Sequence, residues 1–228
     1  MDFNLTEEQL AVAELAERIF ADRLTAEAWR SVAGGFDRPL WEALATAGLL
    51  GISLPSSAGG SGESFLTTAL LLEQAGRHAA PVPLLATVVM GAMPIARFGS
   101  AEQQEAILPA VMDGSLVLTA ALVEQGTEPG SPGTVAQRSG SGSGSGSGAG
   151  SGAAWSLDGA KTCVPAATIA GKFLVPAAVG AGVGVFLVDA ADAGVAVTPL
   201  LTTAGSPSGH LELSGAAGAL VGSVEDGP

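Results

Sequence analysis

Chemically reactive side chains are scarce in this chain of 228 residues, which contains one cysteine and two histidines. A nucleophilic cysteine needs a histidine within hydrogen-bond reach. Only His78 and His210 could serve Cys163, and we expect these two histidines in different parts of the fold, so we interpret Cys163 as an ordinary buried thiol. Glu124 and Glu128 could act as an acid–base pair, but we expect both carboxylates in a solvated loop. We therefore assign no catalytic residue and no metal site.

Lys161 is one of only two lysines in the chain, and it follows a strong turn signal. Asp158 and Gly159 separate two apolar runs, and both residues tolerate the positive φ angles of a tight hairpin. We therefore predict a hairpin at residues 155–164. Lys161 is then expected on its surface or at a contact between domains, rather than as a Schiff-base former.

Two glycine-rich segments raise the question of a phosphate-binding loop. Residues 54–62 read LPSSAGGSG, but no GK[ST] sequence or preceding strand accompanies them, so we interpret the glycines as a sharp turn between helices. Gly148, Gly150 and Ala153 imitate a dinucleotide-binding pattern, but they lie at the end of a Ser/Gly tract, residues 139–152. We expect this tract to be a flexible linker and give the match no weight.

The charge balance excludes several classes of protein. The chain contains nine basic and 22 acidic residues, which gives a net charge of −13 and a pI near 4.3. No basic stripe could neutralise nucleic-acid phosphates, although backbone amides could still bind an anionic ligand. The apolar runs are shorter than the roughly 18 residues of a membrane span, and the acidic N-terminus contains no secretory signal. We expect a cytoplasmic protein.

The first half of the chain has the periodicity of helices. Thr6 and Ser100 each begin a capping box that is completed by a glutamine three residues later, and Asp37 precedes a helix with Pro39 in its first turn. Apolar residues recur at helical spacing after Thr6, which predicts one buried face. About five helices are expected, with the later ones at residues 64–80, 83–98 and 101–114.

From Leu116 the pattern changes to short β-branched or alternating runs that are separated by glycine. Strands do not alternate with helices, which argues against a doubly wound nucleotide-binding fold. We predict a multidomain α+β chain. An N-terminal all-α helical bundle, residues 1–115, precedes an antiparallel β-sandwich or barrel domain, residues 116–226.

The order of motifs along the chain resembles that of the acyl-CoA dehydrogenases. The family pattern L-x-G-x-K-x-x-[IV] matches Leu157, Gly159, Lys161 and Val164, and the run TAALVEQGTEP before it resembles the family's strand followed by TEP. This resemblance implies FAD as cofactor, an acyl-CoA substrate, an electron-transfer acceptor protein and a homo- or hetero-oligomer. It also implies that a C-terminal helical domain, which carries the catalytic glutamate in the family, is missing from this sequence.

By position, the resemblance implies a set of flavin contacts at Ala120, Leu122, Val123, Ser131, Cys163 and Pro165, with Glu124 and Val164 beside them. Cys163 stands at the family's aromatic position, and Val123 stands where threonine is usual. Pro165 replaces the residue whose hydroxyl would bond flavin N5, and proline offers neither a hydroxyl nor an amide donor. Backbone contacts to a flavin can survive these changes, but side-chain hydrogen bonds cannot.

Three functions follow from this resemblance. The first is FAD-dependent α,β-dehydrogenation of an acyl-CoA thioester, by an enzyme of which this chain is an incomplete part. The second is a non-catalytic partner subunit of a heteromeric acyl-CoA dehydrogenase, which the residues at positions 123, 163 and 165 favour. The third is an inactive truncated fragment.

Overall fold

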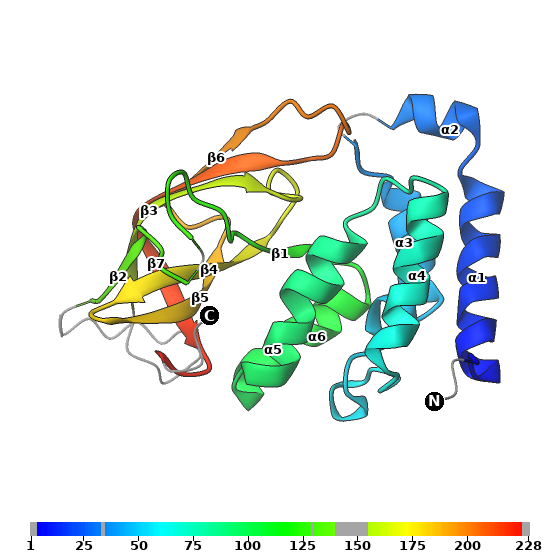
Figure 1. The fold of residues 1–228 in the computed structure, drawn as a ribbon, viewed down its shortest axis with the longest axis horizontal. Coiled ribbons are helices and arrows are strands. Elements are labelled where there is room, and N and C mark those ends of the chain that lie inside the picture. The colour runs from blue at the N-terminus through cyan, green and yellow to red at the C-terminus, as the bar shows by residue number, and fades with distance from the viewer. Residues whose placement is uncertain (1–3, 33–34, 129, 140–154, 225–228) are drawn as a thin grey trace.

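The computed structural model describes residues 4–32, 35–128, 130–139 and 155–224. Helices occupy the described chain up to Met112 and strands occupy it from Leu118 onward (Figure 1), which confirms the predicted α+β class and the order of its parts. The division into two domains at residues 115 and 116 stays a prediction. The pattern at Gly148, Gly150 and Ala153 lies outside the described residues, as does the Ser/Gly tract after Ser139.

The helical region, residues 4–115, contains six α-helices, one π-helical segment and two 3-10 turns among its described residues. They are α1 (Glu7–Arg23), α2 (Ala26–Ser31), α3 (Arg38–Thr46), η2 (Leu49–Gly51), η3 (Ser56–Ala58), α4 (Phe65–Arg77), η4 (Leu85–Ala92), α5 (Met93–Phe98) and α6 (Ala101–Met112). The short helix α2 was not predicted. The single helix predicted over residues 83–98 is a π-helical segment, η4, that continues into α5.

Side chains at the helix ends define where the helices begin. The Thr6 hydroxyl accepts a hydrogen bond from the Gln9 amide at 3.2 Å, and the Gln9 side chain accepts one from the Thr6 amide at 3.0 Å. Ser100 and Gln103 repeat this reciprocal pair at α6. Both predicted capping boxes are therefore confirmed, and each satisfies two amides that have no partner within the helix.

The buried face of α1 packs on α3 and α4. Ala16 and Phe20 are fully buried, and they join a cluster that includes Trp41 and Leu71. The Trp41 indole donates a hydrogen bond to the Gly114 carbonyl at 3.0 Å, which ties α3 to the end of α6. The predicted apolar face of α1 is thus confirmed.

The strand region, residues 116–224, contains seven strands among its described residues. They are β1 (Leu118–Ala120), β2 (Val135–Arg138), β3 (Trp155–Val164), β4 (Lys172–Val179), β5 (Gly182–Asp189), β6 (Val195–Pro199) and β7 (Gly209–Val221). Five of them close into a barrel-like ring in the order β4, β5, β7, β3, β2 and back to β4, while β1 adds to β4 and β6 adds to β7.

Most strand pairs are antiparallel, as predicted, but β1 and β2 run parallel to β4. The antiparallel prediction is wrong for these two pairs. Parallel neighbours need a long crossover rather than a tight turn, and here the crossover from β1 to β4 contains β2 and β3.

The hairpin predicted at residues 155–164 is wrong, because β3 runs straight through this segment and pairs with β7. Asp158 instead accepts a hydrogen bond from the amide of Gly215 at 2.8 Å, and Gly215, with φ of 68°, is the extra residue of a bulge in β7. Gly159 serves a close approach, since a Cβ atom there would lie 2.6 Å from the Thr134 hydroxyl. Asp158 therefore bonds to β7 and Gly159 lets β3 approach Thr134 closely, and the pair forms no turn.

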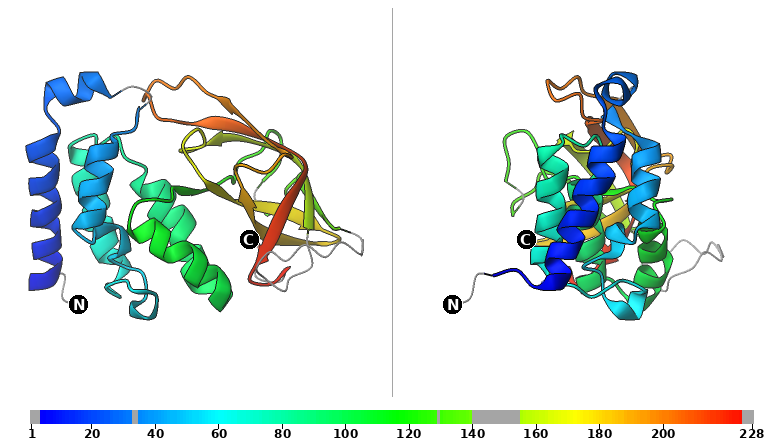
Figure 2. Two further views of the ribbon diagram at one scale, coloured as in Figure 1. Left: turned by 180° about the vertical axis from the view of Figure 1, so that it is seen from behind. Right: turned by 90° about the vertical axis from the view of Figure 1, so that its right-hand side faces the viewer.

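Helices α5 and α6 lie between the outer helices and the strands (Figure 2). Ile95 and Leu108 from these helices share a buried cluster with Leu118 and Leu174 from the strands. The Gln103 side chain also donates a hydrogen bond to the Leu220 carbonyl of β7 at 3.0 Å. The two regions are therefore packed through a common apolar layer. Within the described ranges, every helix is too short or too polar to span a bilayer.

Candidate functional site

Two segments that carry the predicted flavin contacts lie side by side. The chain leaves β1 after Ala120 and runs along the end of β3, where the Val123 carbonyl accepts a hydrogen bond from the Thr162 amide at 2.8 Å. The Thr119 hydroxyl donates to the Pro165 carbonyl at 2.8 Å, which fixes the two segments at a second point. The fold thus brings residues 119–124 and 162–165 together from positions about forty residues apart.

Three of the predicted contacts are exposed residues on these two adjoining segments, and we call them the edge residues: Leu122, Val123 and Cys163. Leu122 is 38% exposed and Val123 is 48% exposed, which are large values for aliphatic side chains. The Cys163 thiol is also exposed, so the prediction of a buried thiol is wrong. The β3–β7 register shifts between Lys161 and Val164, and Cys163 leaves the ladder there with φ of 51°.

Among the other predicted contacts, Pro165 lies on the second of these segments, whereas Ala120 and Ser131 lie apart from the edge residues. Ala120 is buried in the layer between helices and strands. Ser131 is exposed in a separate turn, where its amide donates to the Glu128 carbonyl at 2.8 Å. The predicted set is therefore brought together only in part.

Nucleophilic chemistry at Cys163 finds no support in its surroundings. His78 lies at the end of α4, stacked on Phe20 with the ring centroids 5.9 Å apart. His210 is on β7, where it pairs with Thr198 of β6. Among the described residues, the Cys163 sulfur accepts a hydrogen bond from its neighbour's hydroxyl at 3.7 Å and none from a histidine.

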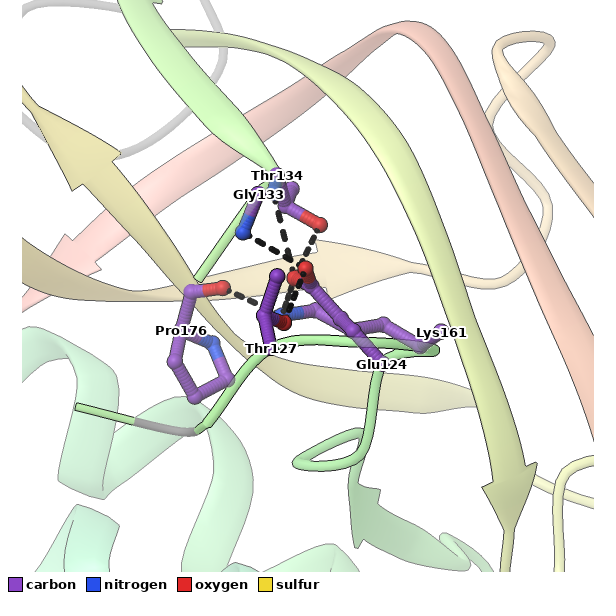
Figure 3. A network of polar contacts seen from close by, with 6 residues as sticks. All are labelled: Glu124, Thr127, Gly133, Thr134, Lys161 and Pro176. Atoms are coloured by element: carbon purple, nitrogen blue, oxygen red, sulfur yellow. Dashed lines mark hydrogen bonds and ion pairs between the residues drawn. The ribbon is translucent and has the colours of Figure 1, made fainter. Parts of the chain in front are cut away.

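Directly behind the edge lies a buried ion pair between Glu124 and Lys161 (Figure 3). The Lys161 ammonium is 2.5 Å from the Glu124 Oε1 atom, and the two side chains are 0% and 7% exposed. The prediction of a solvated Glu124 is therefore wrong, and so is that of Lys161 at a hairpin surface or a contact between domains, because both of its partners lie in the strand region. Lys161 faces inward on β3, as Leu157 does, and its ammonium also donates to the Pro176 carbonyl of β4 at 2.7 Å.

Glu124 is the centre of this network, because it accepts hydrogen bonds from five donors. Besides Lys161, these are the Thr127 hydroxyl at 2.9 Å, the Gly133 amide at 2.6 Å, and both the amide and the hydroxyl of Thr134 at 3.1 and 2.7 Å. One carboxylate thereby joins both ends of the segment from Glu124 to Thr134 to β3.

Burial and hydrogen bonding act in opposite directions on Glu124. Desolvation alone would raise the pKa of the carboxyl, but the bonds from Lys161, Thr134 and Gly133 outweigh it and lower the pKa from 4.5 to about 2. Desolvation lowers the pKa of Lys161, and the charge of Glu124 opposes that shift. At neutral pH the glutamate is therefore ionised and its oxygens are fully engaged.

The glycine-rich loop at residues 54–62 forms the turn that was predicted. Gly59 and Gly62 have φ angles of 92° and 71°, and a Cβ atom on Gly60 would lie 2.2 Å from the Leu54 carbonyl oxygen. The amide of Gly62 donates back to that same carbonyl at 2.9 Å. These contacts close the loop on itself. No group of three or more histidine, cysteine, aspartate or glutamate side chains in the described part of the chain could hold a metal ion.

Known proteins are similar to this chain in sequence and in fold. Residues 6–115 match the family model described as "Acyl-CoA dehydrogenase, N-terminal domain". Over 220 residues the chain is 38% identical to the acyl-CoA dehydrogenase FadE27 of Mycobacterium tuberculosis, covering 95% of this chain and 55% of that protein. The chain belongs to the acyl-CoA dehydrogenase family. It spans about half the length of the curated relative that it matches.

Two solved structures are similar over nearly the whole chain. A variant of the "Tcur3481-Tcur3483 steroid ACAD" is 39% identical with a TM-score of 0.85, covering 95% of this chain and 57% of that one. The "ChsE4-ChsE5 complex from Mycobacterium tuberculosis" is 37% identical with a TM-score of 0.83, covering 98% of this chain and 60% of that one.

The edge residues fit one side of a flavin, the cofactor that family membership implies. They present exposed apolar atoms, which suit packing against a flat aromatic ring system. Val123 and Pro165 carry no side-chain donor, and the Val123 and Pro165 carbonyls already accept hydrogen bonds from Thr162 and Thr119. Contact of these residues with a flavin would therefore depend on packing rather than on side-chain hydrogen bonds.

Proposed function

We propose that this chain is part of a subunit of a FAD-dependent acyl-CoA dehydrogenase, which introduces an α,β double bond into an acyl-CoA thioester. The observation that carries this proposal is that two distant segments, to which the motif resemblance assigns the flavin contacts, adjoin and expose the edge residues. When bound, the flavin accepts the hydride from the substrate. The edge residues would pack against the flavin and orient it.

Family membership also supports the nature of the substrate and the partners. We propose an acyl group that belongs to a fatty acid or a steroid, because the chain is 39% identical to a protein described as a steroid ACAD. We further propose an electron-transfer protein as the acceptor and an oligomeric assembly. The anionic CoA moiety is compatible with the net charge of −13, because backbone amides can bind phosphate in an acidic protein.

Glu124 is unsuited to remove the substrate's α-proton. A general base works best with a pKa near the operating pH, whereas Glu124 has a pKa of about 2 and binds five donors. We therefore propose that a carboxylate other than Glu124 serves as the base.

A flavin titration tests the proposal. The purified chain should quench the fluorescence of added FAD, and Leu122→Asp should weaken binding at least tenfold because it places a charge against the ring. Leu201→Asp is the matched control, since Leu201 is fully exposed in the segment between β6 and β7. Equal FAD affinities for the chain and its Leu122→Asp variant, or no binding by the unmodified chain, would count against a flavin contact at this edge.

A non-catalytic partner subunit is the second candidate function. Val123 and Pro165 favour it, because neither can donate a side-chain hydrogen bond to a flavin. The ChsE4-ChsE5 structure, 37% identical to this chain, is itself a complex. Purification with and without a co-expressed paralogue would decide between the two. A partner subunit should carry flavin only in the mixed oligomer, whereas full flavin content in the chain alone would reject this candidate.

A further inference from the structure

We propose that Lys161 is a positioning residue for the edge residues Leu122, Val123 and Cys163, because its ammonium binds Glu124 and the Pro176 carbonyl together. This inference rests on the proposed function only in taking that edge as the flavin contact. Lys161 itself is fully buried and does not reach the edge, so it would act through the segment that it holds.

The geometry ties the two flavin segments together at consecutive residues. Val123 and Thr162 are joined through their main chains at 2.8 Å, and Glu124 and Lys161 are joined through their side chains at 2.5 Å. The second bond of the ammonium, at 2.7 Å to Pro176, extends this connection to β4 (Figure 3). Three stretches of chain therefore meet at one buried cation.

The hydrogen bonds of Glu124 divide into two kinds. Those from Thr127, Gly133 and Thr134 come from the segment that begins at Glu124 itself, so they close that segment locally. Only the bond from Lys161 connects the carboxylate to β3. Removing the ammonium would leave the segment closed on itself but without its side-chain anchor to the strand that carries Cys163.

An apolar pair could replace a buried ion pair with little loss of stability, so stability alone does not account for this one. A hydrogen-bonded ion pair has a defined direction, whereas apolar side chains slide past one another more freely. The position of the edge relative to β3 is therefore expected to depend on the pair even in a variant whose stability is restored.

A charge-neutral double variant separates position from stability. We would compare the full chain with Lys161→Met, with Glu124→Gln/Lys161→Met and with the control Lys172→Met, which removes an exposed ion pair to Asp189. Glutamine keeps one acceptor oxygen, which can serve the Thr134 amide or the Gly133 amide but not both, because these amides bond different oxygens of Glu124. The measurements are thermal unfolding, hydrogen exchange of the Thr162 amide, and the Kd for FAD.

The single variant Lys161→Met should lower the melting temperature, and the double variant should recover part of this loss because it removes the buried unpaired charge. In the double variant the Thr162 amide should still exchange at least tenfold faster than in the unmodified chain, with at least a tenfold higher Kd for FAD, while Lys172→Met changes neither. Unmodified exchange and FAD affinity in the double variant would overturn the proposal, and so would its failure to fold. If the unmodified chain binds no FAD, the proposed function fails while the exchange rate still decides the role of Lys161.

Discussion

The capping boxes of the helical region and the buried ion pair of the strand region satisfy their polar groups over different distances along the chain. In the helices, Thr6 and Gln9 exchange hydrogen bonds across three residues in an exposed position. In the strands, Glu124 and Lys161 lie 37 residues apart and are both buried. A helix end thus depends on its own neighbours, while the strand region depends on contacts that exist only once the sheet has formed.

Burial makes the second kind of contact the more costly one to break. Water can replace a lost partner at an exposed helix end, but it cannot reach a charge that is fully buried. Substitutions in the two regions should therefore have different effects on stability, and four measurements would test this contrast.

The largest effect is expected for Lys161→Met, which leaves the Glu124 carboxylate buried without its cation. The free energy of unfolding should fall by about 3–5 kcal/mol, as is typical when one member of a buried pair is removed. Urea unfolding at neutral pH measures it. Lys172→Met, which breaks the exposed pair with Asp189, should cost less than about 1 kcal/mol. Equal losses would remove the contrast between buried and exposed pairs.

Acidification should weaken the strand region through Glu124. Its pKa is about 2 in the folded chain and 4.5 as an unperturbed side chain, so its contribution is fully present above about pH 4.5 and is lost as the pH falls toward 2. The loss can reach roughly 3 kcal/mol. Urea unfolding between pH 6 and pH 2 should show a flatter profile for Glu124→Gln. Identical profiles would show that Glu124 has the same pKa in both states.

Gly159→Ala should destabilise the chain by about 1–3 kcal/mol, because the new Cβ atom would lie within 2.8 Å of three Thr134 atoms. Gly76→Ala in α4 is the matched control, since a Cβ atom there meets nothing within 4 Å. This helical substitution should leave stability unchanged or raise it by about 1 kcal/mol. Thermal unfolding of both variants gives the comparison, and a harmless Gly159→Ala would contradict the close approach of β3 and Thr134.

The smallest effect is expected at a helix end. Thr6→Ala removes one half of an exposed capping box and should cost about 1 kcal/mol. Thr46→Ala is a suitable control, because its exposed hydroxyl bonds only to the Glu42 carbonyl within α3. That control should stay within about 0.5 kcal/mol of the unmodified chain. A loss at Thr6 as large as that at Lys161 would refute the ranking of local and long-range contacts.

The same contrast explains what the sequence could predict about the fold. The capping boxes at Thr6 and Ser100 depend on residues three apart, and the bounds of β4 depend on one apolar run, so all three were predictable. β2 was not, because only two of its four residues are apolar and the segment becomes a strand only beside β3. The Asp158–Gly159 pair led to the wrong prediction of a hairpin for a related reason, since Asp158 bonds to a bulge in β7 that lies far along the chain.

The candidate site was predictable in part. Leu122, Val123 and Cys163 were placed by the order of motifs along the chain, and the fold brings them to one edge. Only the position of Lys161 in the strand could have indicated its burial. Side chains alternate between the two faces of a strand, so Lys161, an even number of residues after Leu157, lies on the same face as that leucine. Its partner Glu124 could be found only by knowing which loop crosses the end of β3.

Closure of the strand ring by β7 has a consequence for synthesis on the ribosome. β7 supplies partners to β3, β5 and β6, and its Gly215 lies 57 residues after the Asp158 that it contacts. The helices can pack as soon as they leave the exit tunnel. The strands β3, β5 and β6 keep an unpaired edge until β7 has been synthesised. The nascent chain is therefore expected to pass through a half-folded stage in which the strand region depends on chaperones.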